Sequence, residues 1–169
     1  MKALYAEIKG ELKFAVGKRA FTLSAIADRI EQRQDGSYAI LDYKTGAART
    51  EKQVRTGLAP QLTLEAAILR GGGFNTIAAG SVSEIAYVTL KGGEPAGKPH
   101  EIDFKEGTPD KQADHALAKL KALAAKFEDA ATPYLSLVHP MWKTHYGDYD
   151  HLARVKEWSA TGGGDEGGE

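Results

Sequence analysis

The sequence has 169 residues, a mass of 18.2 kDa, a formal net charge of -1 and a pI near 6.5. Hydrophobic residues make up 42% and charged residues 27% of the chain, which is typical of a soluble globular protein and excludes wholesale disorder. The absence of cysteine excludes disulfides, thiolate nucleophiles, cysteine-ligated zinc and iron–sulfur clusters. Because no apolar run could cross a bilayer and an acid appears as early as Glu7, we expect no membrane helix, no signal peptide and a cytoplasmic location.

The near-neutral charge bears on nucleic-acid binding. A protein that binds DNA by itself usually carries a basic surplus, because phosphate contacts dominate its affinity. A role on DNA would therefore require a local basic surface here, or a partner that supplies the substrate.

Three strands are predicted in the N-terminal part, over residues 5–16, 21–31 and 38–44. Between the first two, Gly17-Lys18 places glycine first, as a two-residue type II′ turn prefers. Between the second and third, Gln34-Asp35-Gly36 predicts a three-residue loop with Gly36 in the left-handed conformation.

The remaining pattern is mostly helical. It predicts a helical segment over residues 50–70, interrupted by Pro60, and a fourth strand over 85–91. A loop over 92–109 with a short strand at 100–105, an amphipathic helix over 109–131 and a helical C-terminal end over 150–158 follow. One domain is expected over residues 1–160, followed by a disordered glycine-rich, acidic tail over 161–169. The expected fold class is α/β of the α+β type, with a mixed central sheet that begins as an antiparallel meander and is flanked by helices.

An acidic residue two positions before a lysine occurs four times, so this spacing alone is not informative. The four pairs are Glu7/Lys9, Glu11/Lys13, Asp42/Lys44 and Asp103/Lys105. The third pair differs because it ends an apolar strand, where alternation places Asp42 and Lys44 on the same face as Ile40.

Turn chemistry predicts which residues lie opposite one another. A three-residue loop ending at Gly36 places Asp28 opposite Asp42, and a two-residue turn at 17–18 places Glu7 opposite Asp28. A single bulge would shift either register. The idealised registers predict a row of three carboxylates, Glu7, Asp28 and Asp42, with Lys44 one step along.

The negative charges in such a row would repel one another and raise the pKa of each carboxyl group. A divalent cation removes that cost, and oxygen ligands select Mg²⁺, Mn²⁺ or Ca²⁺ over zinc. Lys44 beside the cation could orient a water or stabilise charge developing on a phosphate. The alternative is that Asp28 and Asp42 pair only with Arg29, Lys44 or solvent at a strand end.

The segments 27–31 and 39–46 resemble the PD-(D/E)XK nuclease superfamily in its RecB-like branch. The continuation over 52–62 and the late segment 146–158 are similar to the C-terminal nuclease domain of the AddB family, in which AddB is a subunit of a helicase–nuclease that resects double-strand breaks. The resemblance covers nearly the whole chain before the tail. It implies a restriction-endonuclease-like fold.

The resemblance also implies roles for individual residues. Asp28 and Asp42 correspond to the two metal-binding acids, Lys44 to the catalytic lysine, and the backbone carbonyl of Tyr43 to a further metal ligand. Gln61 corresponds to a glutamine that helps to position substrate or water. Relatives often contribute an upstream histidine or glutamate to the site. Either Glu7 takes this role in catalysis and metal binding, as the predicted register suggests, or the chain is an excised piece that lacks part of the site. Glu65 stands where the RecB-like pattern often has tyrosine.

The activity implied is that of a Mg²⁺-dependent deoxyribonuclease of exonuclease type, with Mn²⁺ as a possible substitute and no iron–sulfur cluster. Its expected partners are a single DNA strand delivered by a helicase, an AddA-type subunit and the rest of an AddB chain, with no membrane. Arg49, Lys52 and Arg55 are predicted to contact DNA, although they could equally form an ordinary solvated helix face. Two rival readings are an inactive scaffold that docks a helicase and a self-standing structure-specific endonuclease.

His139, His145 and His151 recur every six residues near acidic side chains. This spacing does not place them on one helical face, so it favours other roles over a zinc site.

Overall fold

The computed structural model of the protein describes residues 1–105 and 107–134. In chain order the described elements are β1 (Ala3–Val16), β2 (Arg19–Gln32), β3 (Tyr38–Lys44), α1 (Glu51–Thr56), α2 (Gln61–Arg70), β4 (Val82–Leu90), β5 (Gly97–Glu101) and α3 (Pro109–Glu128). They all lie in one compact unit, Met1–Asp129; of a second unit, Ala130–Glu169, the structure describes residues 130–134. No helix among the described residues combines the length and hydrophobicity that a bilayer-spanning segment needs.

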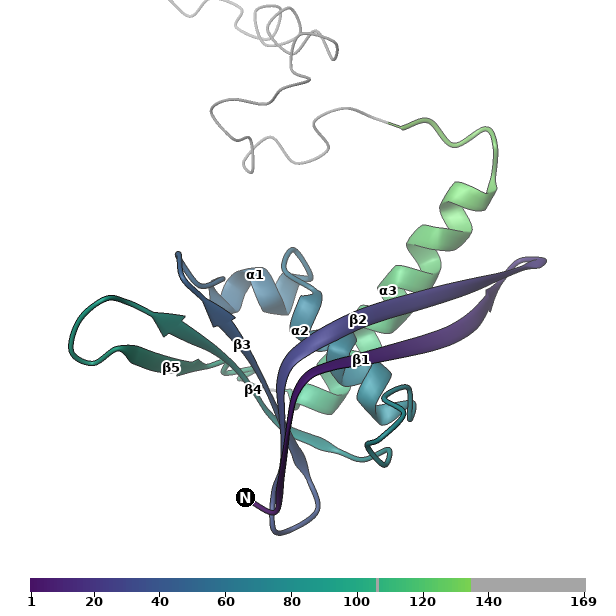
Figure 1. Ribbon diagram of the computed structural model, residues 1–169. Coiled ribbons are helices and arrows are strands. Elements are labelled where there is room, and N and C mark those ends of the chain that lie inside the picture. The colour runs from purple at the N-terminus through teal and green to yellow at the C-terminus, as the bar shows by residue number, and fades with distance from the viewer. Residues whose placement is uncertain (106, 135–169) are drawn as a thin grey trace, which may run out of the picture. The chain divides into compact units, whose positions relative to one another are not determined.

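The five strands form a single sheet in the order β1-β2-β3-β4-β5 (Figure 1). Neighbouring strands are antiparallel except β3 and β4, which are parallel and are connected through α1 and α2. A parallel pair needs such a crossover, because the chain must return to the end of the sheet where the first strand began. The predicted fold class, a mixed sheet that begins as an antiparallel meander and is flanked by helices, is confirmed.

Both predicted hairpin registers are confirmed. Leu12 pairs with Leu23 across β1 and β2, and Ile30 pairs with Ile40 across β2 and β3. The turns have the expected conformations: Gly17 has φ of 57° while Lys18 is not among the residues with positive φ, as a type II′ turn requires, and the loop glycine Gly36 has φ of 87°. Turn residues therefore fix the alignment of the first three strands.

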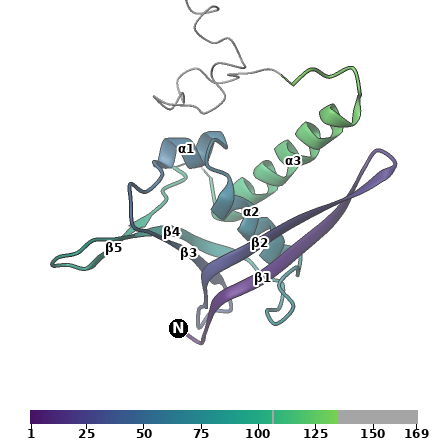
Figure 2. The same cartoon turned by 45° about the horizontal axis from the view of Figure 1, so that its top comes forward.

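Helices α2 and α3 lie on one face of the sheet and contact each other and the strands (Figure 2). The break predicted at Pro60 is confirmed, because α1 ends at the left-handed Gly57 and α2 begins directly after the proline. Seven of the ten residues of α2 are buried, which fits a helix covered by the sheet on one side and by α3 on the other. The core that results includes Ile30, Ile40, Leu62, Ile68, Phe74, Ile85 and Ile102.

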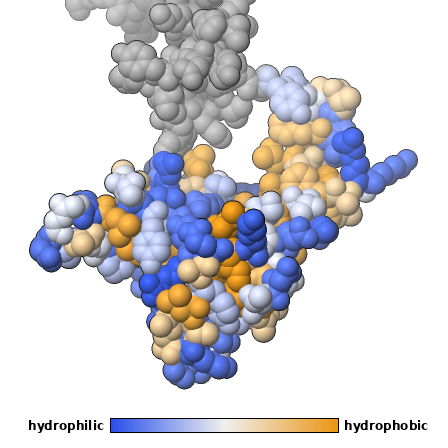
Figure 3. Space-filling view, viewed as in Figure 1, coloured by the Kyte–Doolittle hydropathy of each residue, from blue (hydrophilic) through white to orange (hydrophobic). Residues whose placement is uncertain are grey.

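The far end of α3 is less covered than its beginning. Leu123 is 53% exposed, and apolar side chains gather on the part of the surface where α3 lies (Figure 3). Ala113, near the start of the helix, is fully buried against the core. The helix therefore packs on the sheet mainly through its first half.

Several predicted boundaries are wrong. Strands β1 and β2 begin two residues earlier than predicted, and β2 ends one residue later. The short strand predicted at 100–105 lies at Gly97–Glu101, because it must pair with β4 after the loop at 91–96, and the side chains of Ile102 and Phe104 enter the core instead. The fourth strand is Val82–Leu90 rather than 85–91, and α3 ends at Glu128 rather than 131. The expected helical end at 150–158, the domain boundary at 160, the tail and His139, His145 and His151 lie outside the described residues.

Gly73 is expected to be intolerant of any side chain. Its carbonyl accepts a hydrogen bond from the Glu11 amide at 3.0 Å, and a Cβ added to it would lie 2.2 Å from the Glu11 carbonyl oxygen. We expect Gly73→Ala to lower the free energy of unfolding by about 2 kcal/mol, since the backbone of β1 would have to move. Chemical denaturation measures the effect. Gly93→Ala, where an added Cβ meets nothing within 4 Å, is the control, and equal stability of the two variants would contradict the expectation.

Candidate active site

The end of β3 carries a buried aspartate paired with a lysine. Asp42 is 2% exposed, and the Lys44 ammonium lies 2.6 Å from its Oδ2. The two side chains share one face of β3, as alternation predicts, because they are two residues apart. The contact is ionic rather than aligned as a hydrogen bond, so Oδ2 is buried without a hydrogen-bond partner.

Gln61 connects this pair to α2. Its Nε2 donates to Asp42 Oδ1 at 2.8 Å and to Glu65 Oε1 at 3.2 Å, while its Oε1 accepts a hydrogen bond from Lys44 Nζ at 3.5 Å. Gln61 is the first residue of α2, directly after Pro60. The proline that starts this helix therefore also places the glutamine above the end of β3.

Asp28 is held at the same end of β3. Its Oδ2 accepts a hydrogen bond from the backbone amide of Tyr43 at 2.9 Å. The β2–β3 ladder extends only as far as the pair Arg29–Leu41, so this side chain continues the contact between the strands beyond their last backbone pair. The half-buried Asp28 thus lies beside the segment that carries Asp42 and Lys44.

The predicted row of three carboxylates is not present. Glu7 is exposed and has φ of 50°, and the β1–β2 ladder omits its pairing with Asp28 although it pairs the residues on either side. A left-handed residue inside a strand is a bulge-like irregularity that redirects its side chain. Within residues 1–105 and 107–134, no three acidic or histidine side chains form a group that could hold a metal ion. Glu7 therefore does not join Asp28 and Asp42 as expected.

Burial changes the acidity of two side chains beside Asp42. It raises the pKa of Glu65 to about 7, with the nearby Asp42 and Asp28 raising it further and the Gln61 hydrogen bond and Lys44 acting in the opposite direction. It also raises the pKa of the Tyr87 hydroxyl to about 12. Desolvation disfavours the charged form of both groups, and negative neighbours add to that effect.

Sequence reasoning missed both of these residues. In the sequence Glu65 stands out only as a departure from the tyrosine of the RecB-like pattern, yet it is 2% exposed and its Oε2 has no hydrogen-bond partner. Its position four residues after Gln61 was the available signal, because residues at this spacing are neighbours on a helix. Tyr87 pairs with Asp42 across the parallel β3–β4 ladder, which no turn in the sequence predicts.

The oxygen atoms at the end of β3 are ligands of the kind that suits a hard divalent cation. Asp28, Asp42 and the backbone carbonyl of Tyr43 are oxygen ligands, the kind that Mg²⁺ prefers. The observation that supports the fit is the buried Oδ2 of Asp42, which lacks a hydrogen bond and has only the Lys44 ammonium to balance its charge. A carboxylate oxygen that makes no hydrogen bond in the protein interior is costly unless a cation compensates its charge, as Lys44 does here and as a bound metal ion would.

The three basic residues predicted to contact DNA differ in their surroundings. Arg49 and Lys52 are exposed. Arg55, by contrast, donates hydrogen bonds to the Glu51 carboxylate at 3.0 Å and to the Asp103 carbonyl at 2.8 Å. Its guanidinium braces α1 within the protein, so it is less available to a phosphate than the other two.

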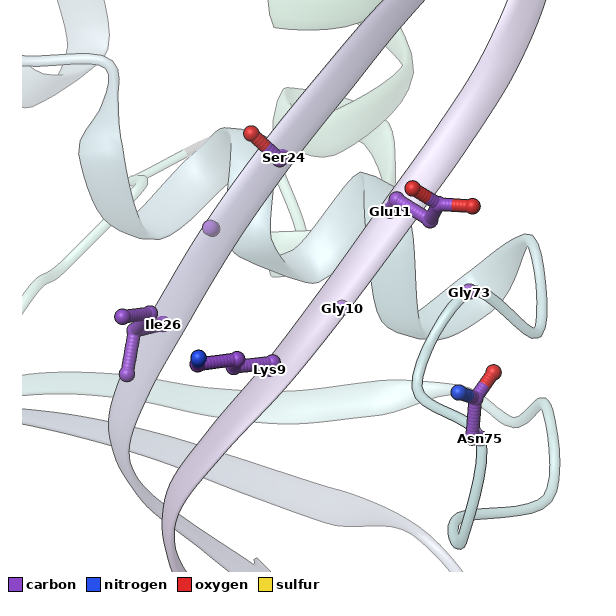
Figure 4. Close-up of a pocket in the computed structure, with 8 residues that line it drawn as sticks. Lys9, Gly10, Glu11, Ser24, Ile26, Gly73 and Asn75 are labelled. Atoms are coloured by element: carbon purple, nitrogen blue, oxygen red, sulfur yellow. The ribbon is translucent and has the colours of Figure 1, made fainter.

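A cavity of about 510 Å³ lies elsewhere on the molecule. Lys9 and Ile26 of the β1–β2 hairpin and Asn75 of the loop after α2 are among its lining residues (Figure 4). None of the residues at the end of β3 lines it. The candidate active site is therefore a surface at a strand end rather than this cavity.

The chain is similar in sequence to proteins of Rickettsia. The chain is 32% identical over 162 residues to an uncharacterized protein of Rickettsia bellii (strain RML369-C), covering 88% of this chain and 18% of that protein. It is 30% identical over 178 residues to one of Rickettsia felis (strain ATCC VR-1525 / URRWXCal2), covering 90% and 21%. The crystal structure of SSO0001 matches with a TM-score of 0.42 at 13% identity, covering 83% of this chain and 62% of that chain.

The chain spans about a fifth of the length of the two Rickettsia proteins. The family model of the PD-(D/E)XK nuclease superfamily matches residues 2–138, which is most of the chain and includes every residue placed above at the end of β3. The chain belongs to the PD-(D/E)XK nuclease superfamily.

Proposed function

We propose that this domain is a Mg²⁺-dependent deoxyribonuclease that hydrolyses phosphodiester bonds. The observation that carries the proposal is the buried Asp42, which contacts Lys44 and Gln61 and lies next to Asp28 at the end of β3. Ionisable groups that are buried and placed in close contact cluster at functional sites.

Each group has a distinct part in this proposal. Asp28, Asp42 and the Tyr43 carbonyl would hold the cation, which when bound lowers the pKa of a water and neutralises charge on the phosphate. Lys44 donates a hydrogen bond to the attacking water or to a phosphate oxygen, where its positive charge stabilises the transition state. Gln61 orients both Asp42 and Lys44 through its amide group.

The finer assignment follows from the resemblance to AddB proteins. We propose that the domain acts as an exonuclease in double-strand break repair in the cytoplasm, as part of a longer AddB-like chain with an AddA-type subunit. The much greater length of the Rickettsia relatives supports a larger setting for the domain. The net charge of -1 supports delivery of a single strand by a helicase, with Arg49 and Lys52 as the local phosphate contacts.

One observation favours a second candidate, an inactive nuclease-like scaffold that docks a helicase. Among the described residues no three acidic side chains converge on one point, and the Lys44–Asp42 pair could stabilise a domain that performs no chemistry. Activity measurements distinguish the two candidates.

The test is cleavage of end-labelled single-stranded DNA as Mg²⁺ is titrated. We expect cleavage to require Mg²⁺, to stop on addition of EDTA, and to fall about a hundredfold in Lys44→Ala, since a positioned charge is lost. Lys13→Ala is the matched control, because Lys13 also follows an acid by two residues and pairs with Glu11 at 3.1 Å. Cleavage that persists in EDTA, or equal rates for the two lysine variants, would contradict the proposal.

A further inference from the structure

The buried position of Glu65 lowers the stability of the fold. It is 2% exposed in the middle of a helix whose other buried positions are mostly apolar, and only one of its oxygens has a hydrogen-bond partner. A buried carboxyl with an unsatisfied oxygen destabilises a fold, whereas a leucine at the same place would add to the core. The packing of α2 alone therefore gives no reason for an acid at this position.

The one hydrogen bond that Glu65 makes leads to the candidate active site. Its Oε1 accepts from Gln61 Nε2 at 3.2 Å, and the same nitrogen donates to Asp42 Oδ1 at 2.8 Å. The other end of the Gln61 amide accepts from Lys44. Gln61 thus has one contact with a residue of its own helix and two with β3.

Without Glu65, the Gln61 side chain would be held only by Asp42 and Lys44, the two groups that it serves. The residue is exposed at the first position of α2, and a glutamine side chain loses considerable rotamer freedom when it is held in one conformation. A buried acceptor four residues along the helix restricts that freedom before substrate arrives. Pre-orientation of this kind can change a rate by a large factor, because small displacements of a positioned group are costly.

We propose that Glu65 is a positioning residue, which holds the Gln61 amide in the orientation that serves Asp42 and Lys44 during phosphodiester hydrolysis. This inference rests on the proposed nuclease function. Glu65 stands at the position where the RecB-like pattern often has tyrosine, and the inference gives this acid a role there.

The rates of a set of variants test this role. We expect Glu65→Leu, which fills the buried space but cannot accept a hydrogen bond, to lower kcat about tenfold with little change in KM. Glu65→Gln retains an acceptor oxygen and should restore kcat to within about threefold of the wild type. Gln61→Ala with Glu65→Leu should be no slower than Gln61→Ala alone, because Glu65 acts only through Gln61.

Thr63→Val is the matched structural control. Thr63 is a buried polar residue of the same helix, and its hydroxyl bonds only to the Pro60 carbonyl. This variant should keep the wild-type kcat. A Glu65→Leu variant as active as Thr63→Val, or effects of the Gln61 and Glu65 changes that multiply, would overturn the positioning role.

A measurement without DNA separates this inference from the nuclease function. The side-chain amide signals of Gln61, assigned in ¹⁵N NMR spectra by their loss in Gln61→Ala, should shift in Glu65→Leu and stay close to the wild type in Glu65→Gln. Unchanged signals in Glu65→Leu would overturn the inference whether or not the protein cleaves DNA. A shift in Glu65→Leu, together with no cleavage by the wild type, would overturn the nuclease function and leave the contact between Glu65 and Gln61 supported.

Discussion

Asp42→Asn is expected to lower the rate of DNA cleavage by about 10³-fold or more, the order seen when a catalytic unit loses one member. The change removes a negative charge without changing the size of the side chain. The asparagine can still accept the hydrogen bond from Gln61, but it cannot provide a charged ligand for a cation. Neutralisation also removes the ion pair with Lys44, but that side chain is 31% exposed and water can solvate its ammonium, so the fold should tolerate the change.

The matched control for this variant is Asp103→Asn. Asp103 also precedes a lysine by two residues, but its side chain is exposed and accepts a hydrogen bond from the Lys105 backbone amide at 2.6 Å. Single-turnover cleavage with saturating protein measures the chemical step for both variants, and thermal melting verifies that both are folded. An Asp42→Asn variant that cuts as fast as Asp103→Asn would remove Asp42 from the chemistry.

Glu65→Gln is expected to stabilise the folded protein above neutral pH. Burial raises the pKa of Glu65 from 4.5 to about 7, so the folded state retains a proton that the unfolded state releases. The wild type therefore has its full stability below pH 4.5 and loses it as the pH rises through 7. Because glutamine cannot ionise, the variant escapes that loss, which amounts to about 3 kcal/mol at pH 8.

The decisive measurement is how the difference in unfolding free energy between Glu65→Gln and the wild type depends on pH. Unfolding by urea in the presence of EDTA, at pH 4 and at pH 8, should give nearly equal stability at pH 4 and a higher midpoint for the variant at pH 8. The corresponding rise in Tm at pH 8 is roughly 8 °C. A constant difference at both pH values would show that Glu65 does not titrate with a raised pKa in the folded state.

Glycine and proline determined what could be predicted of this fold. Gly17 and Gly36 set the two hairpin registers, and Pro60 marked the junction between α1 and α2. The positions of Asp42 and Lys44 on one face followed from strand alternation, and the structure brings them within 2.6 Å. These features are local, so residues close in the sequence were sufficient to predict them.

The rest depends on contacts between distant segments. The irregularity at Glu7 has no signal, because a glutamate with positive φ is not favoured by its own chemistry. The parallel pairing that brings Tyr87 beside Asp42 spans two helices, and the burial of Glu65 depends on how α2 lies between the sheet and α3. A sequence pattern gives the face of a strand or helix but not what will cover that face.

The central place of β3 has a consequence for its dynamics. The strand has a neighbour on each side and α2 across its face, so fraying of an edge strand does not reach it. Amide hydrogens of Ile40 and Leu41 should therefore exchange with deuterium only when the whole domain unfolds. Their exchange rates would report the global folding free energy under native conditions, and they would do so for the strand that carries Asp42 and Lys44.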